Sequence, residues 1–329
     1  MDITLIVLIG LAVVFDFING VNDSSSIVAT MITSRAFSAR TALGVTAAAH
    51  FIAPFLFGVA VATTIGHDIV NASVINNLVI IAALLSAICW DLLTLYLGLP
   101  SSSSHALIGG LVGAVIISAG MEAIYPQGLI GVLLVLLLSP VIGFAGGFLF
   151  TKLVLFLARG ASPRINWFFK RSQILTAVTL AFSHGTNDAQ KTMGVITLGL
   201  VTSGMINSFY VPLWVIFISA TAIALGTATG GWRLIKTLGA RIYKIRPVDA
   251  FNSQVTSTGV ILGASLIGGP VSTTQVVSSS IMGVGSAERL SKVRWSVAGD
   301  IALAWLVTLP ATAILAGGIY WLISTLTSA

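Results

Sequence analysis

Two short polar motifs lie inside long apolar stretches of this 329-residue chain. Each reads Gly-x-Asn-Asp: the first ends in Asn22-Asp23 and the second, in the other half of the chain, ends in Asn187-Asp188. A carboxylate at membrane depth costs roughly 2.5–3.5 kcal/mol on insertion scales, so such residues usually face a cavity or an ion. Carboxylate and amide oxygens suit alkali and alkaline-earth cations. We therefore predict that Asn22, Asp23, Asn187 and Asp188 bind small cations.

Each motif has a companion further along the chain that is rich in hydroxyl groups. Pro100 precedes the serines at 101–104, and Pro270 precedes Val271 and a Ser-Thr-Thr run at 272–274. Proline before a Ser/Thr cap and an apolar stretch is a signal for the start of a helix. A helix start offers unpaired N–H groups and the positive end of the dipole, so it favours anions. Two opposed helix starts could surround a tetrahedral oxyanion with donors. The alternative is that these residues only cap helices and bond packed segments together.

The two kinds of motif fit one chemistry, which is the joint binding of an anion and cations. An oxyanion beside two aspartates is repelled by about 4 kcal/mol per unit-charge pair at 4 Å and an effective dielectric constant of 20. Cations must therefore bind together with the anion, and a gradient of the cation can drive uptake of the anion.

Other polar residues in apolar stretches are less decisive. Lys191 lies three residues after Asp188, so on a helix it can neutralise that carboxylate, with direct substrate contact as the alternative. Asp16, Asp91 and Asp300 have no counterpart in the other half, and a structural role is as compatible with them as a proton or cation site.

The composition limits the elements that can position these residues. With 56% hydrophobic and 8% charged residues, the chain is excluded from the soluble globular proteins, whose charged fraction is about 25%. Its long apolar stretches favour membrane-spanning helices over barrel strands. The net charge of +6 resides mainly in short loops, so it indicates orientation and not a nucleic-acid partner. The single cysteine, Cys89, excludes an internal disulfide. We expect an all-α polytopic protein in the lipid bilayer.

Ten apolar segments are expected, and loops rich in Lys and Arg separate some of them. The loops 34–40, 159–171, 231–250 and 286–294 carry most of the cations and should be cytoplasmic, with both termini outside. The segments are 3–33, 38–66, 73–97, 101–120, 128–158, 172–203, 210–230, 251–268, 271–285 and 295–326.

The order of these segments predicts two inverted repeats, 1–158 and 172–329, joined by a cytoplasmic linker at 159–171. Each repeat has three crossings and a helical hairpin, and the odd number of crossings turns the second copy upside down, as in many secondary transporters. Segment 271–285 spans only about 22 Å, so the second hairpin should be re-entrant with its tip at Pro270. The long runs 3–33 and 172–203 should break at Gly20 and Gly185, where irregular backbone would line a cavity.

These four motifs, in this order, resemble the inorganic phosphate transporter family of secondary carriers. The resemblance rests on 20–23, 100–105, 185–191 and 270–275, and it covers nearly the whole chain. It implies uptake of inorganic phosphate with cations by alternating access between inverted repeats. It also implies that Asn22, Asp23, Asn187 and Asp188 hold the coupling ions. Phosphate would be held by Ser102, Ser103, Ser104, Ser272, Thr273 and Thr274. The short stretch 159–171 resembles compact prokaryotic members, which implies the cytoplasmic membrane.

Several alternatives remain open within and outside this resemblance. The family includes sodium-driven and proton-driven carriers, and some relatives are linked to sulfate. Oxygen-rich motifs poor in histidine favour sodium, and acceptors near the anion favour phosphate, because sulfate has no proton to donate. An ion channel is one alternative class. A hydrolase built on Ser104-His105 is disfavoured, because adjacent helical residues point in different directions and Gln275 replaces the histidine in the second copy. We expect no enzyme activity and no cofactor, with sodium as the coupling ion, and the sequence leaves a homodimer open.

Overall fold

The computed structural model describes residues 3–34, 36–162 and 164–328, and Arg35, in the first cationic loop, lies outside them. In these ranges the chain is helical, and strand-like pairing is confined to one isolated bridge between Val70 and Ile124. The predicted all-α fold is confirmed. The helices are α1 Ile3–Thr33, α2 Ala39–Ile52, α3 Ala60–His67, α4 Asn77–Leu97, α5 Ser103–Ala119, α6 Pro126–Leu157, α7 Ile165–Thr202, α8 Leu213–Thr229, α9 Trp232–Lys236, α10 Pro247–Leu266, α11 Thr273–Glu288 and α12 Trp295–Ser328.

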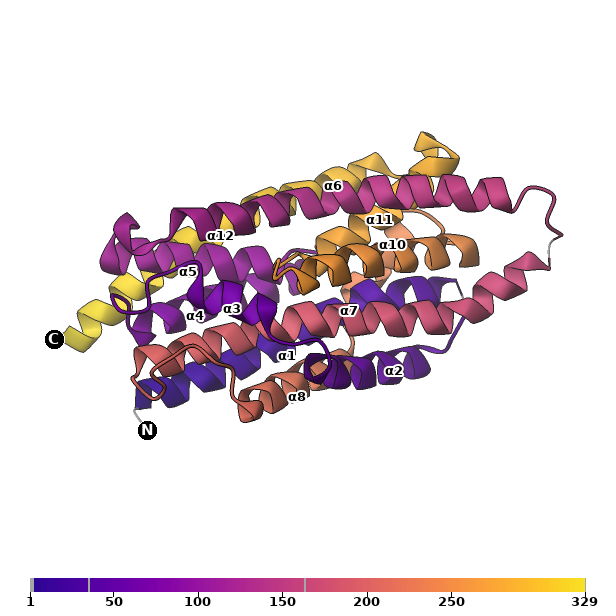
Figure 1. The fold of residues 1–329 in the computed structure, drawn as a ribbon. Coiled ribbons are helices and arrows are strands. Elements are labelled where there is room, and N and C mark those ends of the chain that lie inside the picture. The colour runs from indigo at the N-terminus through magenta and orange to yellow at the C-terminus, as the bar shows by residue number, and fades with distance from the viewer. Residues whose placement is uncertain (1–2, 35, 163, 329) are drawn as a thin grey trace.

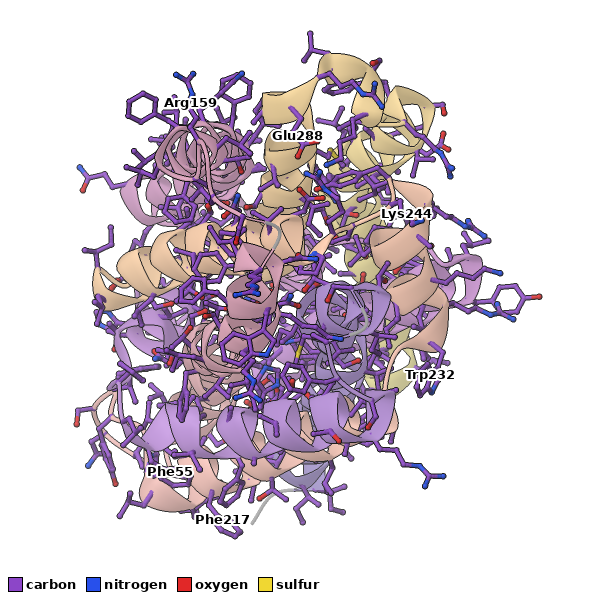
Figure 2. The ribbon with its side chains drawn as sticks, turned by 90° about the vertical axis from the view of Figure 1, so that its right-hand side faces the viewer. Phe55, Arg159, Phe217, Trp232, Lys244 and Glu288 are labelled. Atoms are coloured by element: carbon purple, nitrogen blue, oxygen red, sulfur yellow. The ribbon has the colours of Figure 1, made fainter. Side chains whose placement is uncertain are left out.

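The helices form an elongated bundle (Figure 1). Helix α1 begins and α12 ends at the same end of the bundle, and the connection between α6 and α7 lies at the opposite end. Figure 2 views this opposite end, where Arg159, Lys244 and Glu288 are labelled. Which side of a membrane each end faces stays a prediction.

Four helices of the described chain, α1, α4, α6 and α12, are long and apolar enough to cross a membrane, or up to six spans if two bent pairs are counted. Helices α1, α6 and α12 coincide with three of the six predicted crossings. Helix α7, at 38 residues, is roughly 57 Å long, but the polar residues of its motif interrupt its apolar sequence.

The bent pairs correct two predicted segments. We expected 38–66 to be continuous, yet α2 and α3 meet at 72° across a stretch that contains Pro54 and Gly58, which has φ = 76°. Helix α8 likewise meets the segment Trp232–Arg241 at 59°, just after Gly230 with φ = 76°. The loop predicted at 231–250 is therefore partly helical, because Leu234 and Leu238 are buried against the bundle.

The predicted breaks at Gly20 and Gly185 are wrong, because α1 and α7 run through both positions as continuous helices. A Cβ on Gly20 would lie 2.2 Å from the carbonyl oxygen of Ile223 in α8, and one on Gly185 would lie 2.9 Å from the Cβ of Ala53. These glycines allow close approach of neighbouring segments, as small residues do between membrane helices. Helix α7 also begins at Ile165, inside the stretch 159–171 that we expected to be a loop.

The two hairpins, α4–α5 and α10–α11, are covered by the long helix of the other half. Helix α12 packs along α5, and α6 packs along α11. Both contacts run through glycine: a Cβ on Gly113 of α5 would lie 2.0 Å from the carbonyl oxygen of Ala313, and one on Gly283 of α11 would lie 2.1 Å from that of Phe144. This reciprocal packing is what two related halves would produce, although their inverted orientation stays a prediction.

A network of charged side chains ties the outer ends of α10 and α11 together. Arg246 forms ion pairs with Asp249 and Glu288, and the Lys292 Nζ lies 3.0 Å from Asp249 Oδ2 and 3.1 Å from Glu288 Oε2. Burial lowers the pKa of Lys292, while the buried Asp249 carboxylate beside it acts in the opposite direction. The network fixes the hairpin at the end away from its tip.

The polar motifs lie between two apolar cores. One core includes residues of α1 up to Ile18 and of α7 from Ala189 onward, together with α3, α4 and α5. The other includes α1 from Ile27, α7 up to Ala181, and parts of α2, α10 and α11. The fold therefore places the middles of α1 and α7 at the boundary between the cores, where polar residues can meet.

Candidate functional site

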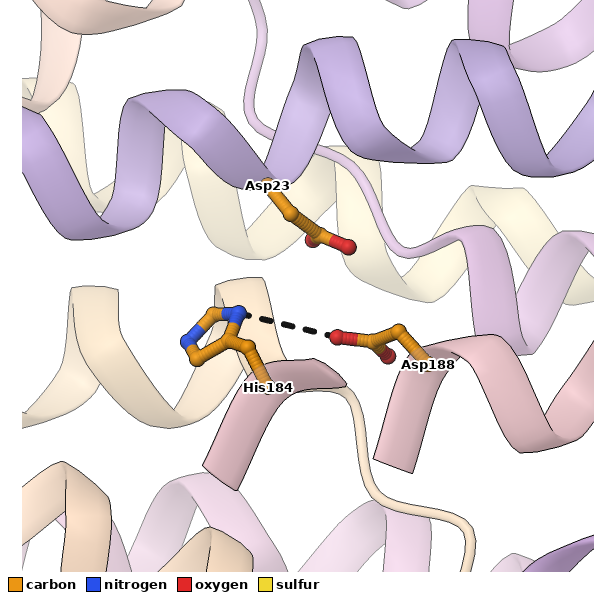
Figure 3. A group of neighbouring side chains, drawn as sticks. All are labelled: Asp23, His184 and Asp188. Carbon is orange, nitrogen blue, oxygen red and sulfur yellow. Dashed lines mark ion pairs between the residues drawn. The ribbon is translucent and has the colours of Figure 1, made fainter. Parts of the chain in front are cut away.

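Asp23, His184 and Asp188 form the centre of the site. Asp23 projects from α1 toward the two α7 residues, as Figure 3 shows. One ligand atom from each of the three lies within 4.8 Å of the others, and all three side chains are buried. The two Asn-Asp motifs, far apart in the sequence, therefore meet in one place.

Each of the four residues predicted to bind cations presents a buried, unpartnered oxygen. Within the described chain, no hydrogen-bond donor reaches Asn22 Oδ1, Asp23 Oδ2, Asn187 Oδ1 or Asp188 Oδ2. Buried polar atoms nearly always have hydrogen-bond partners. Where one has none, a site for an ion is one of the accepted explanations. Carboxylate and amide oxygens are the atom types that small hard cations prefer.

The two hydroxyl runs start helices, as predicted, and the two starts meet. Ser102 caps α5 and Ser272 caps α11, each accepting a hydrogen bond from the backbone N–H three residues later. Ser104 Oγ donates to the carbonyl oxygen of Val271 at 2.8 Å, and Gln275 Nε2 lies 3.4 Å from His105 Nδ1. The tips of the two hairpins are therefore in direct contact inside the protein.

Five of the six hydroxyls predicted to bind phosphate divide into two groups, and the sixth, that of Thr273, donates to Asp23. Ser102, Ser104 and Ser272 already take part in caps or in the contact between tips, so the capping alternative describes part of their role. Ser103 and Thr274 stand in the first turns of α5 and α11 and keep 8% and 6% of their surface exposed. The caps occupy the third N–H of each helix. The N–H groups of the first two residues, at 103–104 and 273–274, have no partner within their helix and can bind an anion.

Three hydrogen bonds join the α10–α11 hairpin to the Asn-Asp motifs. Thr273 Oγ1 donates to Asp23 Oδ1 at 3.3 Å. Asn187 Nδ2 donates to Ser265 Oγ at 2.8 Å and to the carbonyl oxygen of Gly269 at 3.1 Å, at the tip of the α10–α11 hairpin. The hairpin tip and the Asn-Asp motifs are thus parts of one buried centre.

The Ser104-His105 pair does not form a nucleophile and base. His105 Nδ1 lies 2.7 Å from Ser102 Oγ, whereas the Ser104 hydroxyl is directed to Val271. The two side chains have different partners, so this geometry gives the hydrolase alternative no support.

Sequence reasoning missed two histidines of the site. His184 Nδ1 lies 3.6 Å from Asp188 Oδ2, and the ring of His50, from α2, stacks on that of His184 with centroids 6.2 Å apart. His50 Nδ1 in turn lies 2.8 Å from Thr227 Oγ1 of α8. The spacing of four between His184 and Asp188 could have revealed the first contact, since such residues share a helix face. Nothing in the sequence places α2 beside α7, so His50 could not have been found.

The remaining acidic residues and Lys191 have different surroundings. Lys191 is buried and forms an ion pair with Asp188, as the spacing predicted. Asp16 and Asp91 are also buried, and each has a hydroxyl beside it, Thr192 at Asp16 and Ser103 at Asp91. Asp300 is exposed on α12 and lies outside the site.

The chain is similar to known phosphate transporters. The model of the phosphate transporter family matches residues 19–316. A "probable low-affinity inorganic phosphate transporter" of Bacillus subtilis (strain 168) is 43% identical and covers 98% of this chain and 99% of its own length. A protein with the same description from Rhizobium meliloti (strain 1021) is 41% identical over 96% of each chain.

A solved structure described as the sodium-dependent phosphate transporter has the same fold. It superposes with a TM-score of 0.89 over 98% of this chain and 100% of its own, at 23% sequence identity. The family model covers most of the chain, including both Asn-Asp motifs and both hairpin tips. This chain therefore belongs to the phosphate transporter family.

Proposed function

We propose that this protein is a secondary active transporter that imports inorganic phosphate together with sodium by alternating access. The observation that carries the proposal is the meeting of the buried Asp23 and Asp188 carboxylates beside the α10–α11 hairpin tip, which is bonded to Asp23 through Thr273 and to Asn187 through Gly269. Membership in the family and the names of its relatives support phosphate as the substrate.

Electrostatic repulsion between phosphate and the carboxylates explains why phosphate and sodium bind together. Sodium among the four oxygens neutralises carboxylates that would otherwise repel phosphate by about 4 kcal/mol per unit-charge pair at 4 Å and an effective dielectric constant of 20. Phosphate is then held by hydroxyls and N–H groups at the starts of α5 and α11. The bond from Thr273 to Asp23 gives the two ligands a direct connection, so binding of one affects binding of the other.

The buried site suits a carrier better than an open pore. The six hydroxyl residues and four Asn-Asp residues are all at most 8% exposed, so neither ligand has open access from either end. Transport then requires movement that opens each end in turn. We propose that the two halves, in inverted orientation, make this movement in a cytoplasmic membrane with both termini outside.

Sodium is favoured over protons by the amide oxygens of Asn22 and Asn187, which can ligate a metal ion but take up no proton at neutral pH. The similar solved structure is described as that of a sodium-dependent transporter, which agrees with this choice.

The deciding experiment is phosphate uptake into liposomes that contain the purified protein. Labelled phosphate should accumulate under an inward sodium gradient and not when potassium replaces sodium. Accumulation that follows a proton gradient without sodium would reassign the aspartates as proton carriers. Labelled sulfate taken up in place of phosphate would overturn the substrate, and conductance far above carrier rates would favour a channel.

A further inference from the structure

Lys191 is a fixed positive charge inside the proposed cation site. Its side chain is 1% exposed, and its ammonium group is paired with Asp188 Oδ1, one turn earlier on α7. The other oxygen of Asp188 lies 3.6 Å from His184 Nδ1 and belongs to the cluster with Asp23. Asp188 is therefore shared between the lysine and the centre of the site.

The two copies of the motif differ at this position. Three residues after Asp23 stands Ser26, whereas three residues after Asp188 stands Lys191. Ser26 Oγ is buried and has no hydrogen-bond partner in the described chain. One copy therefore supplies its carboxylate with a cation of its own, and the other copy does not.

We infer that the ammonium group of Lys191 takes the place of one of two coupling cations, so that a single mobile cation binds between Asp23 and Asp188. This inference rests on the proposed function. Asp23 and Asp188 contribute two negative charges, and Lys191 balances one of them. A buried charge left without a partner is strongly unfavourable, so the remaining negative charge requires one mobile cation before phosphate can enter.

The number of sodium ions per phosphate tests this directly. Sodium and phosphate uptake are measured with both labels in liposomes, and sodium binding is measured on the purified protein with phosphate present. The wild type should bind one sodium ion at this centre, and Lys191→Met should bind two. The Hill coefficient for sodium should rise from about 1 to about 2. Lys191→Arg, which keeps the charge, should behave as the wild type.

Two further variants test the inference if Lys191→Met does not fold. Asp188→Asn alone should lose sodium-dependent uptake, because Lys191 then neutralises Asp23 and excludes the mobile cation. The double variant Asp188→Asn/Lys191→Met removes one negative and one positive charge, so Asp23 keeps a negative charge that no ammonium group balances, and the purified protein should again bind one sodium ion.

Two results would overturn the inference. One is an unchanged sodium number in Lys191→Met, with or without weaker phosphate binding, since this would make the lysine a structural or phosphate-contacting residue. The other is a folded double variant that binds no sodium. If the wild type itself shows no sodium-driven phosphate uptake, the proposed function is wrong. That result differs from the two above, in which the wild type transports phosphate with sodium.

Discussion

Replacing Asp23 by asparagine tests the core of the site, because the change removes a charge and keeps the shape. The asparagine can still offer one oxygen to Thr273, which now bonds to Asp23 Oδ1 at 3.3 Å. Folding should therefore be preserved. What is lost is the attraction between the carboxylate and the cation.

The size of the effect follows from the compactness of the cluster. The ligand atoms of Asp23, His184 and Asp188 lie within 4.8 Å of one another, so a cation among them is no more than about 4 Å from the Asp23 carboxylate. At that distance the attraction is about 4 kcal/mol with an effective dielectric constant of 20. At 1.4 kcal/mol per factor of ten, this is roughly a 1000-fold loss of cation affinity.

The assay is phosphate uptake into liposomes as a function of sodium concentration. We expect half-saturation to rise by at least about 100-fold, which allows for solvent rearrangement around the neutral residue, so that uptake is lost at ordinary sodium concentrations. Asp300→Asn makes the same chemical change on the exposed face of α12 and should leave uptake unchanged. A folded Asp23→Asn protein with wild-type sodium dependence would refute the site.

Three further changes probe the anion site, the helix packing and the charged network. Thr274→Val removes a hydroxyl donor, and a hydrogen bond to a charged group is worth about 1.5–3 kcal/mol, so the apparent phosphate affinity should fall by roughly 10–100-fold in uptake assays. Gly20→Ala would place a Cβ 2.2 Å from the carbonyl oxygen of Ile223, so α1 and α8 must separate, and thermal denaturation should occur at lower temperature with uptake reduced. Asp249→Asn deprives Arg246 and Lys292 of a buried partner, but both keep Glu288, so the free energy of unfolding should fall by about 1–2 kcal/mol.

Each of these changes has a matched control. Thr221→Val removes an exposed hydroxyl of α8 that bonds only within its helix, and it should not alter phosphate affinity. Gly10→Ala lies in α1 where an added Cβ meets nothing within 4 Å. Glu122→Gln changes an exposed acid. If a variant and its control have equal effects, the explanation given for that variant is wrong. The explanation is the anion site for Thr274→Val, the helix contact for Gly20→Ala and the charged network for Asp249→Asn.

Much of the site could be predicted because its signals are local. Pro100 and Pro270 with their hydroxyl runs start helices, a property of a few adjacent residues. The pairing of Lys191 with Asp188 follows from helix spacing alone. The meeting of the two Asn-Asp motifs was predictable for a different reason, since isolated buried carboxylates are too costly to leave apart.

Other features depend on contacts between distant segments and could not be predicted. Glycine inside an apolar run can either break a helix or allow another helix to pack closely. Only the position of α8 shows that Gly20 allows close packing. The bend at Gly58 is an exception, because Pro54 just before it is a local signal that ends helices, and the prediction of one crossing over 38–66 did not use that signal. The position of His50 depends on how α2 packs on α7, for which the sequence carries no local signal.

The packing of each long helix on the other half's hairpin has a consequence for biosynthesis. When the first 158 residues have left the ribosome, α5 and α6 exist, but the helices that cover them, α12 and α11, have not yet been made. Gly113 stays without its neighbour in α12 until Ala313 is translated. The first half must therefore wait in the membrane as an incomplete assembly. A chain truncated before α12 should be a substrate for membrane proteases rather than a smaller transporter.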